Sequence, residues 1–375
     1  MIGWKRFHEG DERGVTTIAR VAREAGVGVG TVSRVINGSG SVSDATRRRV
    51  LDVVAELGYE PNAAARALST GRTRTIGVVA PFFTRSSVIE RLRGIAPRLA
   101  ADGYQMILFD VERPEQRDAA FRSLIGRVDG LLSISLAPSA ADLDRLEAAG
   151  VSVVLVDHDH EHLPVVVVDD VEGGRIAVRH LLELGHRRIA FAGDTEDGVH
   201  GFPASSRRRV GYQEAIATAG LELSKDLVRV RPHGHASGRA IARELLSLRE
   251  PPTAIFAASD MQALSLIEAA QGLGVKVPEE LSVIGFDDIE VSRYAGLTTV
   301  AQPLGESGVR GAELLLADLA GGAGAEGDPA RVVRLALRLV RRDTTAPPGQ
   351  AFHLSRAGRT DRGRHRVTDD MMATS

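Results

Sequence analysis

Acidic side chains follow three apolar runs of this 375-residue chain, each directly after the run ends. They are Asp157, Asp260 with Ser259 before it, and Asp287. An ionised carboxylate accepts several hydroxyl hydrogens, so carboxylates gathered in a cleft suit a polyhydroxylated ligand. The alternative is that each acidic residue only ends a strand or caps a helix, and taken singly the residues leave both explanations open.

Other chemistries find less support in the chain. The run Asp157–His162 resembles a metal-binding cluster, but alternation along an extended segment sends successive side chains to opposite faces. Gly26, Gly28 and Gly30 resemble a phosphate-binding loop, yet no strand precedes them and the spacing of the third glycine is wrong. No Gly-x-Ser-x-Gly elbow and no His-Glu-x-x-His helix occurs. We therefore expect no catalytic residue, no metal site, no cofactor and no enzyme activity.

The carboxylates must be positioned by regular elements, and the chain from residue 76 to about 340 alternates strand-like and helix-like segments. Strands are predicted at Ile76–Ala80, Gln105–Val111, Gly130–Leu136, Val151–Asp157, Val165–Asp169, Arg188–Gly193, Leu227–Val230, Ala254–Ala258 and Ser282–Asp287. A helix around Glu172–Leu184 separates the first five from the last four. This alternation is typical of parallel, doubly wound sheets, and two sets indicate two Rossmann-like lobes with a ligand at the carboxyl ends of the strands.

A different pattern occupies residues 17–36, where two short helices are predicted on either side of a turn at Gly26. Ile18, Val21 and Ala22 repeat at helical spacing, and Gly26 can take the positive φ of a tight turn. This is the layout of a helix-turn-helix, whose second helix lies in the DNA major groove. On these residues alone an ordinary amphipathic helix pair remains the alternative.

The flanking residues favour DNA binding. Ser43 and Asp44 begin a third predicted helix that Gly58 ends, and a short helix-prone segment, 62–68, follows Pro61. Residues 13–74 hold ten Arg against five acidic residues, a charge of +5, so the remainder of this −2 chain carries −7. A basic head on an acidic body is expected where only the head touches a phosphate backbone.

The composition favours a protein that stays inside the cell. The chain has no cysteine, which suits a reducing compartment, and no run approaches the 18 or so apolar residues of a membrane span. Residues 1–14 are polar and do not resemble a secretory signal. We expect a cytoplasmic protein with no membrane partner.

From about Val15 to about Thr345 the sequence resembles the lactose/galactose-repressor (LacI/GalR) family of bacterial transcription factors. The resemblance implies an all-α helix-turn-helix head and an α/β body of two Rossmann-like lobes, similar to periplasmic binding proteins. The implied domains are a flexible extension at 1–14, the DNA-binding domain at 15–61, a hinge helix and linker at 62–75, an effector-binding and dimerisation body at 76–345, and a disordered Arg-rich tail at 346–375.

The implied function is that of a homodimeric repressor on a near-palindromic operator, controlled by a small effector in the cleft between the lobes. A sugar or sugar derivative is the expected effector, because acidic residues with an arginine favour a neutral sugar over a purine. A regulator of the same fold controlled by a purine-type or other co-repressor is one alternative. A sugar-binding protein without DNA function is another.

The resemblance also implies which head residues contact DNA. Val29, Gly30 and Arg34 take the base-reading positions, Thr31 contacts phosphate, and Leu68 takes the place of a wedge that kinks the duplex. The full set expected at DNA is Thr17, Val29, Gly30, Thr31, Arg34, Asn37, Ala65 and Leu68. Two glycines, at 28 and 30, are expected to weaken the recognition helix by roughly 1 kcal/mol each relative to Ala.

In the body, Arg208 and Asp287 match family segments that contact the ligand. The segment from Leu297 to Pro303 is similar to the crossover strand of the family, in which Gln302 would face the cleft by analogy. Ser259 stands where the family often has Asn. Phe82 or Phe83 could stack on a sugar ring or simply pack after a strand. The full set expected at the effector is Phe82, Phe83, Asp157, Arg208, Ser259, Asp260, Asp287 and Gln302.

Overall fold

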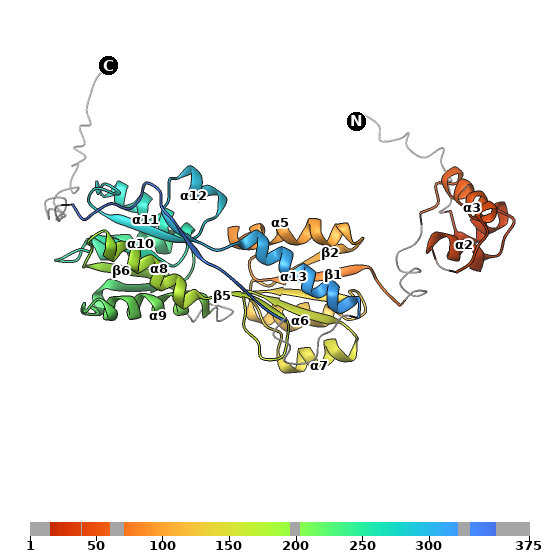
Figure 1. The fold of residues 1–375 in the computed structure, drawn as a ribbon, viewed down its shortest axis with the longest axis horizontal. Helices are drawn as coiled ribbons and strands as arrows, with labels where there is room; N and C mark the ends of the chain where they lie inside the picture. Colours follow the sequence, from red (N-terminus) through yellow and green to blue (C-terminus); the bar gives the residue numbers. More distant parts are fainter. Residues whose placement is uncertain (1–15, 39, 61–70, 196–202, 322–330, 350–375) are drawn as a thin grey trace, which may run out of the picture. The chain divides into compact units, whose positions relative to one another are not determined.

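The computed structural model describes residues 16–38, 40–60, 71–195, 203–321 and 331–349 (Figure 1). The chain divides into two compact units, residues 1–74 and residues 75–375. Each unit has its own hydrophobic core, so each is described by itself.

The first unit is a three-helix head. Its helices are α1 (Ile18–Glu24), α2 (Val29–Ile36) and α3 (Asp44–Glu56). Side-chain oxygens of Thr17 and Ser43 accept from backbone N–H groups in the first turns of α1 and α3, which explains where these helices begin. A small core joins all three helices through Val21, Val32 and Val50, which are fully buried.

The turn between α1 and α2 corrects one expectation about the head. Gly26 takes a positive φ of 62°, as predicted. Gly28, however, is the N-cap of α2 with extended backbone and does not lie inside the helix. Glycine is an acceptable N-cap, so of the two glycines only Gly30 weakens α2.

The second unit contains two six-stranded sheets, one in each lobe. The N-lobe sheet has the order β11-β5-β4-β3-β1-β2, and the C-lobe sheet has the order β12-β10-β9-β8-β6-β7. The N-lobe strands are β1 (Thr75–Ala80), β2 (Gln105–Asp110), β3 (Gly130–Ile134), β4 (Ser152–Val156), β5 (Val165–Val168) and β11 (Val332–Leu335). The C-lobe strands are β6 (Ile189–Asp194), β7 (Val228–Arg231), β8 (Ala254–Ala257), β9 (Ser282–Asp287), β10 (Thr299–Ala301) and β12 (Arg338–Val340).

Helices cover both faces of each sheet. The N-lobe core on one face includes side chains of α5 and α13, and that on the other face includes side chains of α6 and α7. In the C-lobe, α10 and α11 share one core with the sheet, and α8 and α9 share the other. The helices are α5 (Ser86–Ala101), α6 (Pro114–Leu124), α7 (Ala140–Ala148), α8 (Asp170–Glu183), α9 (Pro203–Thr218), α10 (His235–Leu246), α11 (Asp260–Gly272), α12 (Glu290–Tyr294) and α13 (Leu304–Leu319). A short 3-10 helix spans Lys225–Leu227.

The predicted fold class, a helical head with a two-lobed α/β body, is confirmed. All pairings among the described strands are parallel except β10 with β12. The chain passes between the lobes three times, from β5 to α8, from β10 to α13 and from β11 to β12 (Figure 1). Among the described residues, no helix is both long and apolar enough to cross a membrane.

Two glycines bring α8 and α9 into direct backbone contact. A Cβ on Gly211 of α9 would lie 1.9 Å from the Val171 carbonyl oxygen, and one on Gly174 of α8 would lie 2.2 Å from the Arg208 carbonyl oxygen. Only glycine permits this approach. The contact holds the start of α8 and the middle of α9 together, and both carry charged side chains of the site.

Candidate functional site

A cavity of about 570 Å³ lies at the carboxyl ends of strands from both lobes. Its N-lobe wall includes residues that follow β1, β3 and β4, and its C-lobe wall includes residues that end or follow β6, β8 and β9. This is the edge at which open α/β sheets bind ligands. The volume is within the range of small-molecule sites.

Unusual backbone conformations gather around this cavity. Among the described residues, six non-glycine residues have positive φ, and four of these line the cavity: Phe82, Ser135, Asp157 and Asp287. Each lies at the end of a strand or just beyond it. Such conformations cost of order 1–3 kcal/mol each and concentrate at functional sites.

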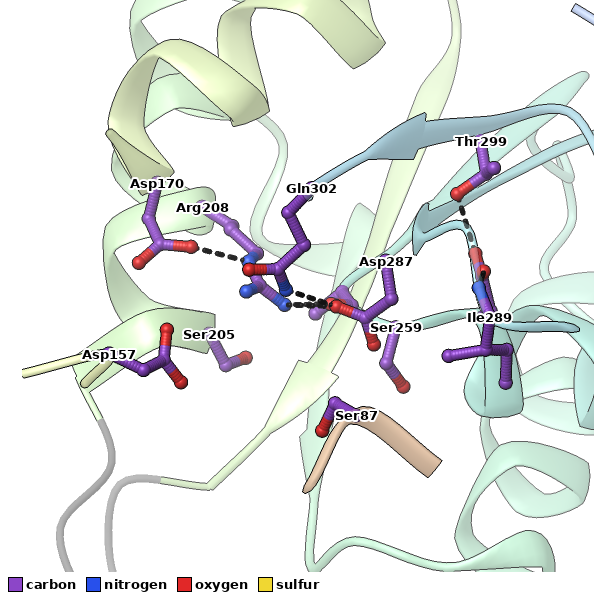
Figure 2. A network of polar contacts seen from close by, with 12 residues as sticks. Ser87, Asp157, Asp170, Ser205, Arg208, Ser259, Asp287, Ile289, Thr299 and Gln302 are labelled. Carbon is purple, nitrogen blue, oxygen red and sulfur yellow. Dashed lines mark hydrogen bonds and ion pairs between the residues drawn. The ribbon is translucent and has the colours of Figure 1, made fainter. Parts of the chain in front are cut away.

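Arg208 is the central cation of the C-lobe wall. It is 6% exposed, and its Nε donates to Oδ1 of Asp170 at 2.8 Å while Nη1 donates to the Ala258 carbonyl at 2.6 Å. The guanidinium also lies 3.7 Å from the centroid of the Phe286 ring. Its contacts with Asp170, the Ala258 carbonyl and the Phe286 ring fix its orientation. Figure 2 shows Arg208 between Asp170 and Asp287.

Asp287 lies beside this cation and accepts a hydrogen bond from Gln302, the residue directly after β10. Nε2 of Gln302 donates to Oδ1 of Asp287 at 2.5 Å, and Nη1 of Arg208 lies 3.9 Å from the same oxygen (Figure 2). Burial raises the pKa of Asp287, although Arg208, Gln302 and Arg91 oppose the shift. The carboxylate is therefore a desolvated acceptor, which a hydroxyl donor of a ligand would stabilise.

The N-lobe contributes a second buried ion pair, which sequence reasoning missed. Nη2 of Arg91, on α5, lies 3.0 Å from Oδ1 of Asp157, and it donates to Oε1 of Gln302 at 3.3 Å. The hydroxyl of Ser135 donates to the other oxygen of Asp157 at 2.6 Å. Gln302 thus joins Arg91 of the N-lobe to Asp287 of the C-lobe through its two amide atoms.

Asp260 does not line the cavity, and this differs from the expectation that it contacts the effector. It is 0% exposed and accepts from the hydroxyls of Ser292 and Thr299, both at 2.6 Å, and from the Ile289 amide at 3.0 Å. Burial and the neighbouring Asp287 raise the pKa of Asp260 to about 7 despite these three donors. Its position makes it a support for the loop after β9.

Only one of the two predicted phenylalanines lines the cavity. Phe82 lines it, whereas Phe83 does not and is 38% exposed, with its backbone N–H donating to Asp110. Ser259 lines the cavity and caps α11, because its hydroxyl oxygen accepts from the backbone N–H of Gln262. Of the eight predicted residues, the cavity brings together Phe82, Asp157, Arg208, Ser259, Asp287 and Gln302.

Several lining residues were not anticipated. Asp194 ends β6, and Nε2 of Gln262 donates to its Oδ1 at 2.7 Å. Asp194 could have been found, because it follows an apolar strand as Asp157 and Asp287 do. Gln262 and Arg91 carry no such signal, since each lies within a helix.

The arrangement suits binding more than catalysis. Carboxylates, an amide and guanidinium groups converge on one cavity, which provides acceptors and donors for a ligand with many hydroxyl groups. Within the described residues, no three His, Asp or Glu side chains are grouped to hold a metal ion.

The head presents a second candidate surface on α2. Val29 is 46% exposed, Gly30 and Arg34 are exposed, and Thr31 is half-buried. Nε of Arg34 donates to the Gly30 carbonyl at 3.1 Å, which directs the side chain along the helix. Thr17 caps α1, and Asn37 caps the end of α2.

Two predicted DNA contacts cannot be placed in this way. Ala65 and Leu68, with the rest of the predicted hinge helix, lie outside the described residues.

Both units match models of known families. Residues 17–62 match the family described as bacterial regulatory proteins, lacI family. Residues 178–345 match the periplasmic binding protein-like domain.

Curated relatives extend over most of the chain. The transcriptional regulator DegA of Bacillus subtilis (strain 168) is 37% identical over 304 residues, which cover 78% of this chain and 88% of DegA. The transcriptional regulator CelR of Thermobifida fusca is 37% identical over 317 residues, which cover 81% of this chain and 92% of CelR.

Solved structures agree with these relatives. A complex of the transcriptional regulator CelR with cellobiose has a TM-score of 0.64 at 34% identity, covering 88% of this chain and 99% of that one. The lac repressor dimer bound to operator and the anti-inducer ONPF has a TM-score of 0.76 at 28% identity, with the same coverage.

Proposed function

This chain belongs to the LacI family of bacterial transcriptional regulators, and we propose that it is a repressor that binds operator DNA as a homodimer and responds to a sugar or sugar derivative. The observation that carries the effector half of this proposal is the buried Arg208, Asp287 and Gln302 cluster in the wall of the cavity. Desolvated carboxylates beside an oriented guanidinium favour a ligand rich in hydroxyl groups. The complex of CelR with cellobiose supports the same class of ligand.

The DNA half of the proposal rests on the exposed face of α2. In a dimer two copies of α2 enter successive major grooves, so the operator is a near-palindrome. The proposed contacts are Thr17, Val29, Gly30, Thr31, Arg34 and Asn37, with Ala65 and Leu68 of the linker. Because only Gly30 and small side chains accompany Arg34, DNA shape contributes much of the specificity. The lac repressor bound to operator supports this mode of binding.

We propose that the effector controls DNA affinity by changing the arrangement of the lobes. Gln302 touches Arg91 of one lobe and Asp287 of the other, so a ligand that competes for these groups acts on both walls of the cavity. Residues 62–75 connect the head to the start of β1 and transmit the change. Coupling of this kind is typically worth 1–3 kcal/mol.

A repressor that binds operator DNA works in the cytoplasm, and we infer no catalytic step for it. The test is a gel-shift titration with duplex DNA from the region upstream of the chain's own gene, with and without each of a panel of sugars. We expect specific binding that one sugar changes. Failure to bind any duplex at low salt would contradict the regulator function.

The effector site is tested by Asp287→Asn in the same titration. This variant keeps the size of the side chain but loses the charge, so the sugar response should disappear while DNA binding remains. Asp144→Asn, at an exposed position on α7, is the matched control. An unchanged sugar response in Asp287→Asn would show that this cluster does not bind the effector.

A further inference from the structure

The cavity has room for more than one sugar ring. A hexose has about twelve non-hydrogen atoms, and even if each filled the roughly 30 Å³ of a whole water molecule, the sugar would occupy at most about 360 Å³. The cavity measures about 570 Å³. A ring bound at the Arg208, Asp287 and Gln302 cluster therefore leaves space for further atoms of the effector.

The register of the C-lobe sheet shows where this space lies. Asp287 ends β9, Ser259 follows β8 and Asp194 ends β6, and these three strands are neighbours in the sheet. The pairing register of β8 with β9 and with β6, continued to the strand ends, places the three residues side by side. His233 follows the next strand, β7, and all four residues line the cavity. The cavity thus continues from the cluster toward β7.

This row of strand ends is longer than one ring can reach. Gln302, directly after β10, and His233, after β7, are separated by four strand spacings, or about 19 Å at about 4.8 Å each. Opposite hydroxyl oxygens of one ring lie about 6 Å apart, and hydrogen bonds of about 2.8 Å at both ends extend the reach to roughly 11 Å. A ring bound at Gln302 therefore stops short of Asp194, which is three spacings away.

Asp194 is an acceptor that such a first ring leaves available. Nε2 of Gln262 donates to its Oδ1 at 2.7 Å, and Nδ1 of His233 lies 3.3 Å from its Oδ2. These contacts orient the carboxylate, and a carboxylate offers about four acceptor positions, so it keeps capacity for ligand hydroxyls. The side chains of Asp194 and His233 are 27% and 29% exposed, and both line the cavity. A ligand can therefore reach this carboxylate.

The surroundings of Asp194 suit a neutral sugar ring. Burial lowers the pKa of Arg85, whereas the charges of Asp194 and Asp287 raise it, so this N-lobe cation and Asp194 attract one another. With that cation near it, the carboxylate favours neutral hydroxyl donors over a second cation. Met261, which is 42% exposed, and Pro232 also line the cavity. Apolar side chains of this kind pack against the C–H groups of a ring while its hydroxyls reach polar groups.

We propose that Asp194, with Gln262 and His233, forms a subsite for a second sugar ring, and that the effector is a neutral disaccharide. The first ring lies at Asp287 and Gln302. This inference rests on the proposed function, and it narrows the effector from a sugar of any size to one with two linked rings.

Calorimetry on the full chain tests the size of the effector. The panel comprises maltose, cellobiose, lactose, sucrose and trehalose, with their component sugars glucose, galactose and fructose, whose weaker binding is measured by displacement. We expect one disaccharide to bind at least about a hundredfold tighter than either of its components. Tightest binding by a monosaccharide overturns the second subsite and leaves the sugar-controlled repressor intact. Binding by no sugar of the panel overturns the sugar effector itself.

Asp194→Asn tests the subsite with the disaccharide that binds best. The variant keeps the size of the side chain but loses its charge and one acceptor oxygen, so the ratio of disaccharide to monosaccharide affinity should fall about tenfold. A general distortion of the site would weaken both sugars and leave this ratio unchanged. Asp226→Asn, at an exposed position just before β7, is the matched control and should keep the wild-type ratio.

A second variant approaches the subsite from another strand. His233→Ala lies in the loop after β7, where the side chain is partly exposed, so it leaves β6 intact if Asp194→Asn does not fold. It removes the contact that orients Asp194 and should lower the same affinity ratio. A wild-type ratio in both variants would overturn the subsite.

Discussion

Replacing Gly211 by Ala should disturb the effector site without touching any residue of the cavity. The new Cβ would lie 1.9 Å from the Val171 carbonyl oxygen, whereas real Cβ atoms essentially never approach within 3.0 Å. Helix α9 must therefore move away from α8 by about 1 Å, a change that typically costs 1–3 kcal/mol. Arg208 lies one turn earlier on α9, so its 2.8 Å bond to Asp170 of α8 stretches toward the limit of an ion pair.

Urea unfolding of the body and calorimetric titration of the effector measure the two consequences. We expect a loss of about 1–3 kcal/mol in the free energy of unfolding and a loss of about tenfold in effector affinity. DNA binding in the absence of effector should persist, because the head is a separate unit. Gly272→Ala on α11, where a Cβ meets nothing within 4 Å, is the control. Wild-type stability and effector affinity in Gly211→Ala would refute the link between this helix contact and Arg208.

Three further changes probe other parts of the chain. The pKa of Asp260 is about 7 in the folded chain and near 3.8 in the unfolded chain, so between these pH values only the folded chain binds this proton, and the free energy of unfolding should fall as the pH rises from about 4 to 7. Asp260→Asn should flatten this pH dependence of the urea midpoint. An equally steep profile in the variant would contradict the assignment. Arg34→Ala should weaken specific operator binding by about 1–3 kcal/mol in gel shifts, with a smaller effect on unrelated duplex; equal losses would exclude base reading. Ser43→Ala removes the cap that accepts from Thr46 and should destabilise the head by about 1 kcal/mol in thermal unfolding.

Most of the strands and helices could be predicted, because the sequence patterns that mark them involve residues close together in the chain. The predicted strands from Ile76 to Asp287 agree with the observed ones to within a few residues, since apolar runs between turn residues mark buried parallel strands. The edge strands β11 and β12 carry weaker signals. Their exposed residues include Arg334 and Arg338, and long-range pairing with β5 and β10 makes them strands.

From local sequence pattern alone, the site was predictable only where strand ends mark it, whereas Arg208, within α9, was predicted from the family resemblance. Asp157 and Asp287 follow β4 and end β9 in positive-φ conformations that turn their side chains to the cavity. Asp260 has the same sequence pattern, but it begins α11, and its side chain is bound by the loop after β9. Arg91 and Gln262 face the cavity from within helices, and their positions depend on packing that no local pattern encodes.

The path of the chain through the lobes also sets the order in which a newly made molecule acquires its properties. The head is complete at α3, whereas the N-lobe sheet gains its edge strand β11 only after the C-lobe elements from α8 to β10 and then α13 have been made. At about 5–20 residues per second, some 280 residues separate the two events by roughly 15–60 s. During synthesis the basic head can therefore fold well before the part that would restrain it, and a ribosome-bound chain has a DNA-binding unit that no effector yet governs.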